Sequence, residues 1–249
     1  MGRTAIITGT NRGIGQAILK RFAKEKDICI IAHARKESEG FLKSLEEIRG
    51  SNPGVMIEPV YFDLTKPEEI KKSLSDTLKI HKYVDVLINN AAIVMPNKSF
   101  LMMDQETLRT SLEVNFFAQV QITQIVCRAM IRNKGGAIVN MASIAAFSGI
   151  EGQFEYVTGK AAIVGMTRRL ANELSPYHIR VNAAAPGLIN TDMIMQMDDS
   201  MREGLIDRTV AQRLADPSEV ATAVYFLASE EASFVNGQVL TVNGGGYKF

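Results

Sequence analysis

The sequence predicts an α/β fold in which a parallel sheet is covered by helices on both faces, and three observations predict it. Short apolar runs alternate with longer stretches of helical periodicity from one end of the chain to the other. The chain has 249 residues, of which 46% are hydrophobic and 22% charged, so it can bury a full core. Several of its 19 glycines fall where a strand gives way to a helix.

The apolar runs and the helical stretches give the order of the elements. Strands are expected at 3–8, 27–33, 55–62, 84–89, 136–141, 178–184 and 238–243. Helices are expected at 13–25, 37–49, 67–80, 104–132, 154–174 and 217–229. The last of these begins where Asp216 precedes Pro217, because Asp caps unpaired amides and Pro suits the first helical position. This order predicts a Rossmann-type, doubly wound sheet of seven parallel strands.

We expect residues 1–249 to form a single domain with one unusual segment. Residues 186–215 contain no clean strand, and methionines are dense there, at positions 193, 195, 197 and 201. Long connections in compact domains are usually functional or contain short helices, and flexible Met side chains suit a surface that adapts to an apolar ligand. The segment is therefore predicted to be a substrate lid.

Charge and cysteine content exclude several classes of protein. The chain carries 28 Lys and Arg against 27 Asp and Glu, so its net charge of +1 predicts no nucleic-acid partner and no attachment to an anionic membrane. No apolar run reaches the ~18 residues of a membrane span. Cys29 and Cys127 lie far apart and form no paired motif, which indicates a reduced, cytoplasmic protein. The three histidines show no metal-ligand spacing, so no metal site is predicted.

Residues 8–15, TGTNRGIG, form a glycine loop between an expected strand and an expected helix. Glycine adopts backbone angles that other residues avoid, and it lets the chain approach a pyrophosphate at the helix N-terminus. The loop is thus predicted to bind a dinucleotide coenzyme through the residues Gly9, Asn11, Arg12, Gly13, Ile14 and Gly15.

The segment after the second expected strand, IIAHARKES, indicates which coenzyme is bound. An acidic residue at this strand end would bind the ribose 2′-hydroxyl of NAD, but here the strand ends at His33 and Arg35 follows. Arg35 and Arg12 can both pair with a 2′-phosphate, which favours NADP(H).

Tyr156 and Lys160 are four residues apart on an expected helix, so their side chains share one face. An ammonium about 4 Å from a phenol would stabilise the phenolate by roughly 4 kcal/mol at an effective dielectric of 20, equivalent to about three pKa units before the cost of desolvation. We therefore expect Lys160 to lower the pKa of Tyr156 and make it a general acid. Ser143 follows an expected strand, at the edge where such sheets bind ligands, and could hold a substrate oxygen.

With these motifs the chain resembles the short-chain dehydrogenase/reductase family along its whole length. The resemblance rests on TGTNRGIG at 8–15, NNAA at 89–92, Asn115, Ser143, YVTGK at 156–160 and PGLINT at 186–191. It departs from the family pattern at Ala92 and Asn243, where Gly and Asp are usual.

The resemblance implies specific roles for these residues. Ser143 orients the carbonyl, Tyr156 transfers the proton, Lys160 binds the nicotinamide ribose and lowers the pKa of the phenol, and Asn115 supports a water-linked proton relay. The implied coenzyme contacts outside the glycine loop and the catalytic residues are Asp63, Leu64, Asn90, Ala91, Pro186, Gly187, Ile189 and Thr191.

Within the family the chain is most similar to bacterial 3-oxoacyl-(acyl-carrier-protein) reductases. This resemblance implies reduction of 3-oxoacyl thioesters with NADPH in fatty acid synthesis, with an acyl carrier protein docked on basic residues by the active-site mouth. Lys134 matches one of those basic positions, whereas Tyr177 or His178 stands at the second. Two alternatives stay open: a dehydrogenase of a sugar, polyol or other small secondary alcohol, and a coenzyme-binding protein without activity.

The helices expected at 104–132 and 154–174 are apolar around much of their circumference. Phe116, Phe117, Ile122, Ile125 and Val126 illustrate this excess, which packing between the two helices could also absorb. The family resemblance implies a homotetramer with these helices at one interface.

Overall fold

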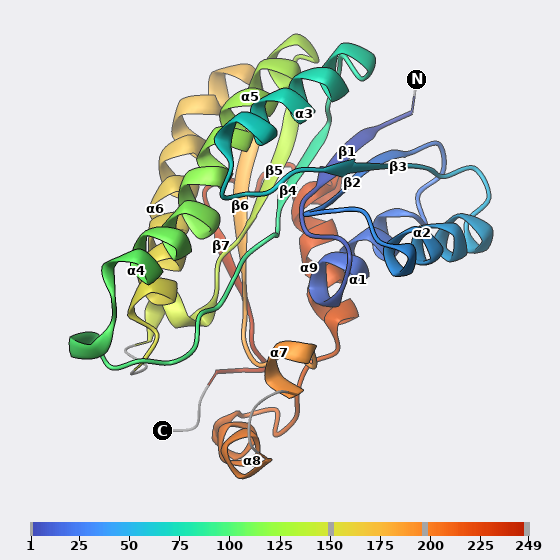
Figure 1. Ribbon diagram of the computed structural model, residues 1–249. Coiled ribbons are helices and arrows are strands. Elements are labelled where there is room, and N and C mark those ends of the chain that lie inside the picture. Colours follow the sequence, from blue (N-terminus) through green and yellow to red (C-terminus); the bar gives the residue numbers. More distant parts are fainter. Residues whose placement is uncertain (1, 149–151, 196–198, 247–249) are drawn as a thin grey trace.

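The computed structural model describes residues 2–148, 152–195 and 199–246. Its seven strands form one parallel sheet in the order β3-β2-β1-β4-β5-β6-β7, which confirms the predicted fold (Figure 1). The strands are β1 (Thr4–Ile7), β2 (Cys29–Ala34), β3 (Met56–Tyr61), β4 (Val86–Asn89), β5 (Gly136–Met141), β6 (Ile179–Pro186) and β7 (Val239–Val242).

Helices cover both faces of the sheet, as Figure 1 shows. One face packs against α1 (Gly13–Phe22), α2 (Glu39–Ser51) and α9 (Pro217–Ala228). The other packs against α3 (Pro67–Ile80), α5 (Ala118–Arg132) and α6 (Phe154–Leu174). The capping box between Asp216 and Glu219 starts α9 where the sequence predicts it.

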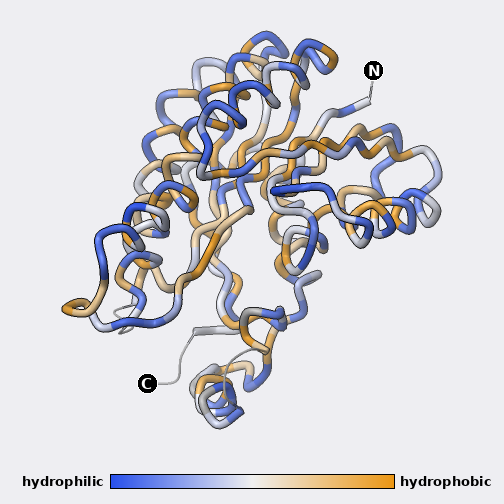
Figure 2. The backbone as a smooth tube through the Cα atoms, in the orientation of Figure 1, coloured by the Kyte–Doolittle hydropathy of each residue, from blue (hydrophilic) through white to orange (hydrophobic). Residues whose placement is uncertain are grey.

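Successive residues of β1 show why the strands are continuously apolar. Ala5 and Ile7 belong to the core under α1 and α9, whereas Ile6 belongs to the core under α3 and α5. Side chains alternate between the two faces of a strand, and here both faces are buried. In Figure 2 the apolar colour accordingly runs through the strands, while polar and apolar residues alternate along the helices.

The helix expected at 104–132 is present, and it contains a π-helical turn that the sequence did not predict. It consists of α4 (Gln105–Leu112), a π-helical turn η2 (Glu113–Phe117) and α5. A π-turn inserts an extra residue into the helical ladder and is frequent at functional sites. The remaining short turns are η1 (Phe100–Met102), η3 (Ile144–Phe147), η4 (Ser175–Tyr177) and η5 (Glu230–Ala232).

The segment expected to be a lid contains two short helices, α7 (Asp192–Met195) and α8 (Asp199–Arg208). Figure 1 shows both beyond the carboxyl ends of the strands, standing off from the sheet. Met197, one of the four methionines singled out there, lies outside the described residues.

Most of the apolar side chains that the sequence places around the long helices are buried within the chain itself. Ile122 and Val126 are fully buried in the core, and Phe116 and Ile125 pack against it. Of the five residues expected at an interface, Phe117 is exposed, at 53%. Among the helices of the described residues, none has both the length and the apolar character needed to cross a membrane.

Candidate active site

The glycine loop connects β1 to α1 and is held by close backbone contacts. Gly9 and Gly13 have positive φ angles of 72° and 56°, in the left-handed region that favours glycine. A Cβ atom on Gly15 would lie 1.9 Å from the carbonyl oxygen of Gly9. The loop therefore folds back on itself so tightly that a side chain at position 15 does not fit.

The N-terminus of α1 suits an anionic group. Arg12 is the N-cap residue, but its side chain makes no capping hydrogen bond within the described part of the chain, and the first turn contains no acidic residue. The first amides of a helix carry a partial positive charge and need acceptors. Together with the glycine loop, this arrangement fits the pyrophosphate of a dinucleotide.

Asn90, predicted to line the coenzyme, braces the glycine loop. Its side-chain amide donates to the carbonyl oxygens of Thr8 and Gly9 at 2.8 and 3.1 Å. The Thr8 hydroxyl accepts hydrogen bonds from the backbone amides of Asn90 and Ala91 at 2.9 and 3.0 Å. The segment after β4 thus fixes the loop after β1, its neighbour in the sheet.

His33, to which the sequence assigned no role, also holds this loop. The ring is 2% exposed and stacks on Phe62 with centroids 3.9 Å apart. Nδ1 accepts a hydrogen bond from the Gly9 amide at 3.1 Å, and Nε2 lies 2.9 Å from the Phe62 carbonyl oxygen. Since an amide can only donate and a carbonyl can only accept, the ring is neutral with its proton on Nε2. Burial lowers the pKa of His33 to about 4.

The two arginines expected at the 2′-phosphate occupy different surroundings. Arg35 is exposed just after β2, and its charge acts on Asp63 after β3. Burial tends to raise the pKa of Asp63, but hydrogen bonds from Thr65 and the charges of Arg35 and Lys66 outweigh it and lower the pKa. The guanidinium of Arg12 lies 3.6 Å from the carboxylate of Asp192, the first residue of α7. The sequence did not indicate this contact between the glycine loop and α7.

Ser143 and Lys160 meet at the carboxyl end of β5. Ser143 follows the strand and caps η3, where its hydroxyl accepts from the Ala145 amide at 3.1 Å. Lys160 is 2% exposed, and its ammonium donates to the Met141 carbonyl oxygen at 2.7 Å. Burial lowers the pKa of Lys160 to about 8, because a desolvated ammonium loses its proton more easily.

Tyr156 is half-buried one helical turn before Lys160 on α6. Lys160 Nζ lies 5.7 Å from the centroid of the phenol ring. Burial raises the pKa of Tyr156, while a hydrogen bond with Ser143 acts in the opposite direction. Desolvation of the phenolate, which the sequence-based expectation left out, therefore decides the direction of the shift in this structure.

Asn115 lies in the π-turn η2 and joins it to the segment after β4. Its Oδ1 accepts from the Ile93 amide at 2.9 Å, and its Nδ2 donates to the Ile93 carbonyl oxygen at 2.9 Å and to Ser111 Oγ at 3.1 Å. A Cβ atom on Gly159 would lie 3.3 Å from Asn115 Cβ, so α6 approaches the turn closely beside Lys160. The Asn115 side chain thus holds the π-turn against the segment after β4. Its predicted part in a proton relay stays a prediction.

The start of the segment 186–215 reaches the glycine loop. Gly187 donates from its amide to the Val242 carbonyl oxygen at 3.0 Å, and Ile189 is 4% exposed and paired with Ala215. The position of a Cβ on Gly13 lies 3.5 Å from Thr191 Cγ2. Thr191 therefore lies beside the loop that would hold the coenzyme.

The predicted site residues gather at one edge of the sheet. They follow the carboxyl ends of β1 to β6 or lie on helices that reach this edge, as in other doubly wound sheets. Leu64 and Ile14 are placed there too, but their side chains pack on the core clusters.

Within one chain Lys134 lies away from this edge, and its predicted part in docking a carrier protein stays a prediction. It precedes β5, whereas Ser143 follows that strand, and β5 extends about 16 Å from its first residue to its last. The Gly136 amide donates to the His178 carbonyl oxygen at 3.2 Å, so His178 lies at the same far end.

Comparison with known proteins points to a single family. A family model described as "Enoyl-(Acyl carrier protein) reductase" matches residues 9–247. The 3-oxoacyl-[acyl-carrier-protein] reductase FabG of Aquifex aeolicus is 36% identical over 244 residues, which cover 98% of this chain and 97% of that protein.

Solved structures share the fold. A putative NAD(P)-dependent gluconate 5-dehydrogenase from Beutenbergia cavernae, with bound NADP at low occupancy, has a TM-score of 0.90 and 35% identity, and 98% of this chain and 96% of that one are covered. A 3-oxoacyl-[acyl-carrier protein] reductase from Brucella melitensis has a TM-score of 0.90 and 30% identity, covering 99% and 92% of the two chains.

Proposed function

Since this chain belongs to the NAD(P)-dependent oxidoreductases of the short-chain dehydrogenase/reductase family, we propose that it is an NADPH-dependent ketoreductase that reduces 3-oxoacyl thioesters to 3-hydroxyacyl thioesters. The observation that carries the proposal is that Tyr156 and the buried Lys160 lie one helical turn apart on α6, at the carboxyl end of β5 that Ser143 follows. Similarity to 3-oxoacyl reductases supports the choice of substrate.

The catalytic residues act on the oxygen of the substrate carbonyl. The coenzyme, when bound, supplies the hydride. Ser143 donates a hydrogen bond to the oxygen, and Tyr156 transfers its proton to it. The raised pKa of Tyr156 keeps the phenol protonated at neutral pH, which is the state that reduction needs. Lys160, whose ammonium lies 5.7 Å from the centroid of the phenol ring, stabilises the phenolate that forms when this proton leaves.

Residues at the ends of β1 and β2 support NADPH as the coenzyme. The amides at the start of α1 would hold the pyrophosphate. β2 ends at Ala34 and so offers no carboxylate there to a ribose 2′-hydroxyl, and His33 before it is committed to Gly9 and Phe62. Arg35 follows the strand as an exposed guanidinium, suited to a 2′-phosphate.

A dehydrogenase of gluconate or another polyol is the second candidate, because the similar solved structures include gluconate dehydrogenases. A panel of NADPH and NADH with an acetoacetyl thioester, and of NADP⁺ and NAD⁺ with gluconate and simple polyols, separates the two. We expect the highest kcat/KM for NADPH with the acetoacetyl thioester. If a polyol is oxidised faster than the thioester is reduced, the second candidate is the function. If the coenzyme binds but no substrate is turned over, the protein is a coenzyme-binding protein without activity.

A thioester substrate carried by an acyl carrier protein is part of the same proposal. The basic residue Lys134 lies at the far end of β5, so within one chain it does not flank the catalytic residues. Comparing kcat/KM for the carrier-bound and the coenzyme A-bound acetoacetyl group tests the partner. A lower KM for the carrier-bound form is the expected result, and equal values would remove the carrier protein from the proposal.

We also propose assembly into a homotetramer. Three aromatic side chains on and beside the π-turn and α6 are exposed, Phe117 at 53%, Phe147 at 56% and Phe154 at 43%. A second copy of the chain would remove these surfaces from water. Light scattering over a range of concentrations should give the mass of four chains, and a monomer at every concentration would contradict the assembly.

A further inference from the structure

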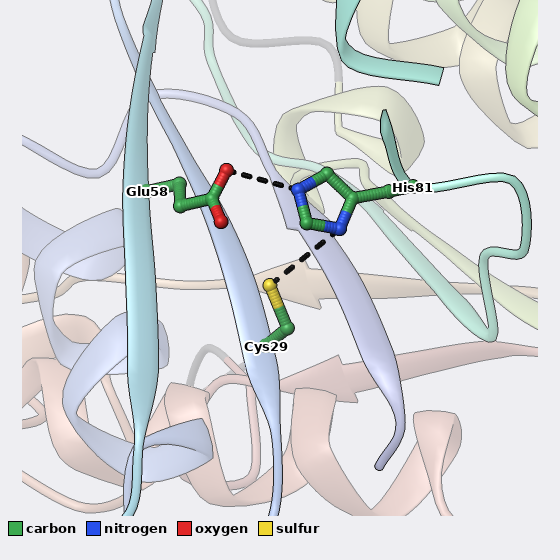
Figure 3. A group of neighbouring side chains, drawn as sticks. All are labelled: Cys29, Glu58 and His81. Carbon is green, nitrogen blue, oxygen red and sulfur yellow. Dashed lines mark hydrogen bonds and ion pairs between the residues drawn. The ribbon is translucent and has the colours of Figure 1, made fainter. Parts of the chain in front are cut away.

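Three side chains that can bind a metal meet on the edge of the sheet farthest from Ser143, Tyr156 and Lys160. They are Cys29 at the start of β2, Glu58 in β3 and His81 just after α3 (Figure 3). The sequence predicted no metal site, because the three residues lie 29 and 23 positions apart and share no motif.

The parallel pairing of β2 and β3 explains how the cluster forms. Glu58 pairs with Ile31, and both Ile31 and Cys29 contribute to the core under α3 and α5. Residues two apart on a strand share a face, so Cys29 and Glu58 point to the same side. The helix α3 runs over this face and ends at Ile80, which places His81 above the two strands.

The ligand atoms are close to one another already. Cys29 Sγ lies 3.9 Å from His81 Nδ1, and His81 Nε2 lies 2.9 Å from Glu58 Oε2. One ligand atom from each residue can be chosen so that all three lie within 4.8 Å of one another. Bonds of 2.0–2.3 Å in a tetrahedral zinc site place ligand atoms about 3.3–3.8 Å apart. In the structure Cys29 and Glu58 face different nitrogens of the His81 ring, so zinc binding requires the ring to turn until one nitrogen faces both of the other ligand atoms.

The donor set matches zinc. Thiolate, imidazole and carboxylate are the three kinds of ligand that Zn²⁺ takes in proteins, and the soft thiolate disfavours Mg²⁺ and Ca²⁺. A thiolate and a carboxylate together balance the two positive charges of the ion. Without an ion, burial and the Glu58 carboxylate raise the pKa of the Cys29 thiol to about 11, so the thiol stays neutral.

We propose that Cys29, Glu58 and His81 form a Zn²⁺ site, with water as the fourth ligand, that ties β2, β3 and the end of α3 together. The site is separate from the coenzyme loop, since the strand β2 extends about 16 Å from Cys29 to Ala34. The proposal does not depend on the proposed function. Because native protein binds the ion through three distant segments and the unfolded chain does not, zinc should stabilise the fold.

Cobalt absorption tests the coordination directly. Titration of the purified, metal-stripped protein with Co²⁺ should produce a thiolate-to-metal charge-transfer band that saturates at one ion per chain and disappears on addition of Zn²⁺. Cys29→Ser should abolish the band, and His81→Gln should weaken Zn²⁺ binding by more than the roughly 10–100-fold that loss of an outer contact costs. Cys127→Ser, at the other cysteine, is the matched control and should leave the band unchanged.

Two measurements on the unaltered chain keep the test decisive if a variant does not fold. Zn²⁺ should raise the Tm, and it should protect Cys29 from alkylation, as read by mass spectrometry, while the labelling of Cys127 does not change. Absence of the charge-transfer band in the wild-type protein, a band that survives Cys29→Ser, or Cys29 labelling that is indifferent to Zn²⁺ would overturn the proposal. The three residues would then be a hydrogen-bonded cluster only.

Discussion

Acid should destabilise this protein through His33. In the folded state its pKa is about 4, against the ordinary 6.5 expected for the unfolded chain. A depressed folded pKa means that stability is complete above pH 6.5 and is lost as the pH falls toward 4, because only the unfolded state takes up the proton in that window. The full difference corresponds to about 3 kcal/mol, and to about 2.4 kcal/mol between pH 7 and pH 4.5.

The contacts of the ring explain the cost. Protonation would place a second donor, Nδ1–H, against the Gly9 amide, which now donates to that nitrogen at 3.1 Å. His33→Gln keeps a donor and an acceptor on the side chain but removes the titration. At pH 7 we expect the variant to be less stable by about 1–2 kcal/mol, since its hydrogen bonds are less well aligned. At pH 4.5 this deficit should vanish or reverse.

Urea unfolding of both proteins at pH 7 and pH 4.5, at one ionic strength, measures the difference. The free energy of unfolding of the wild type minus that of the variant is compared at the two pH values. The contribution of carboxylates that titrate in both proteins cancels in this difference. Thr10→Ala is the control, because it removes the hydrogen bond to the His33 carbonyl oxygen at 3.1 Å and changes no titrating group. A wild-type advantage over His33→Gln that stays constant from pH 7 to pH 4.5 would refute the reasoning.

Three further predictions concern the candidate active site. Tyr156→Phe should lower kcat by about 10²–10⁴-fold and leave NADPH affinity, measured by fluorescence, unchanged; retained turnover would disprove the role of the phenol. Gly15→Ala should raise the KM for the coenzyme because its Cβ would meet the loop backbone at 1.9 Å, whereas Gly165→Ala, where nothing lies within 4 Å, should not; equal KM values for the two variants would contradict the tight loop. Arg35→Glu should shift the ratio of kcat/KM for NADPH over NADH by about 10–150-fold toward NADH, the value of a lost charged hydrogen bond of about 1.5–3 kcal/mol. Lys36→Glu makes the same charge change one residue along and should shift this ratio less, and an equal shift would show that the effect is not local to Arg35.

The fold could be predicted well because its signals are local. All seven strands lie within or close to their predicted ranges, since a buried strand requires a run of apolar residues. The boundary at Asp216 and Pro217 was also correct, because a helix cap depends on a few neighbouring residues. The π-turn at Asn115 was not predicted, since its apolar periodicity continues through the turn and the side-chain contact with Ile93 is distant in sequence.

The sequence could predict which residues gather at the carboxyl ends of the strands, but it could not predict their electrostatics. The spacing of Tyr156 and Lys160 correctly placed them on one helix, but only burial decides the direction of their pKa shifts. His33 was visible only as a histidine at a strand end. Its two hydrogen bonds connect β2 to the loop after β1 and to the residue after β3. Contacts between segments this far apart leave no pattern in the sequence.

The amino-acid sequence by itself determined the order of strands and helices, the glycine loop and the residues at the carboxyl ends of the strands, because these follow from local periodicity and backbone preference. The tertiary structure alone decided which end of β5 holds Lys134, how far Lys160 lies from Tyr156, and that Cys29, Glu58 and His81 meet. Such features depend on distances between segments far apart in the chain and on exclusion of water, and both arise only when the sheet and its helices pack.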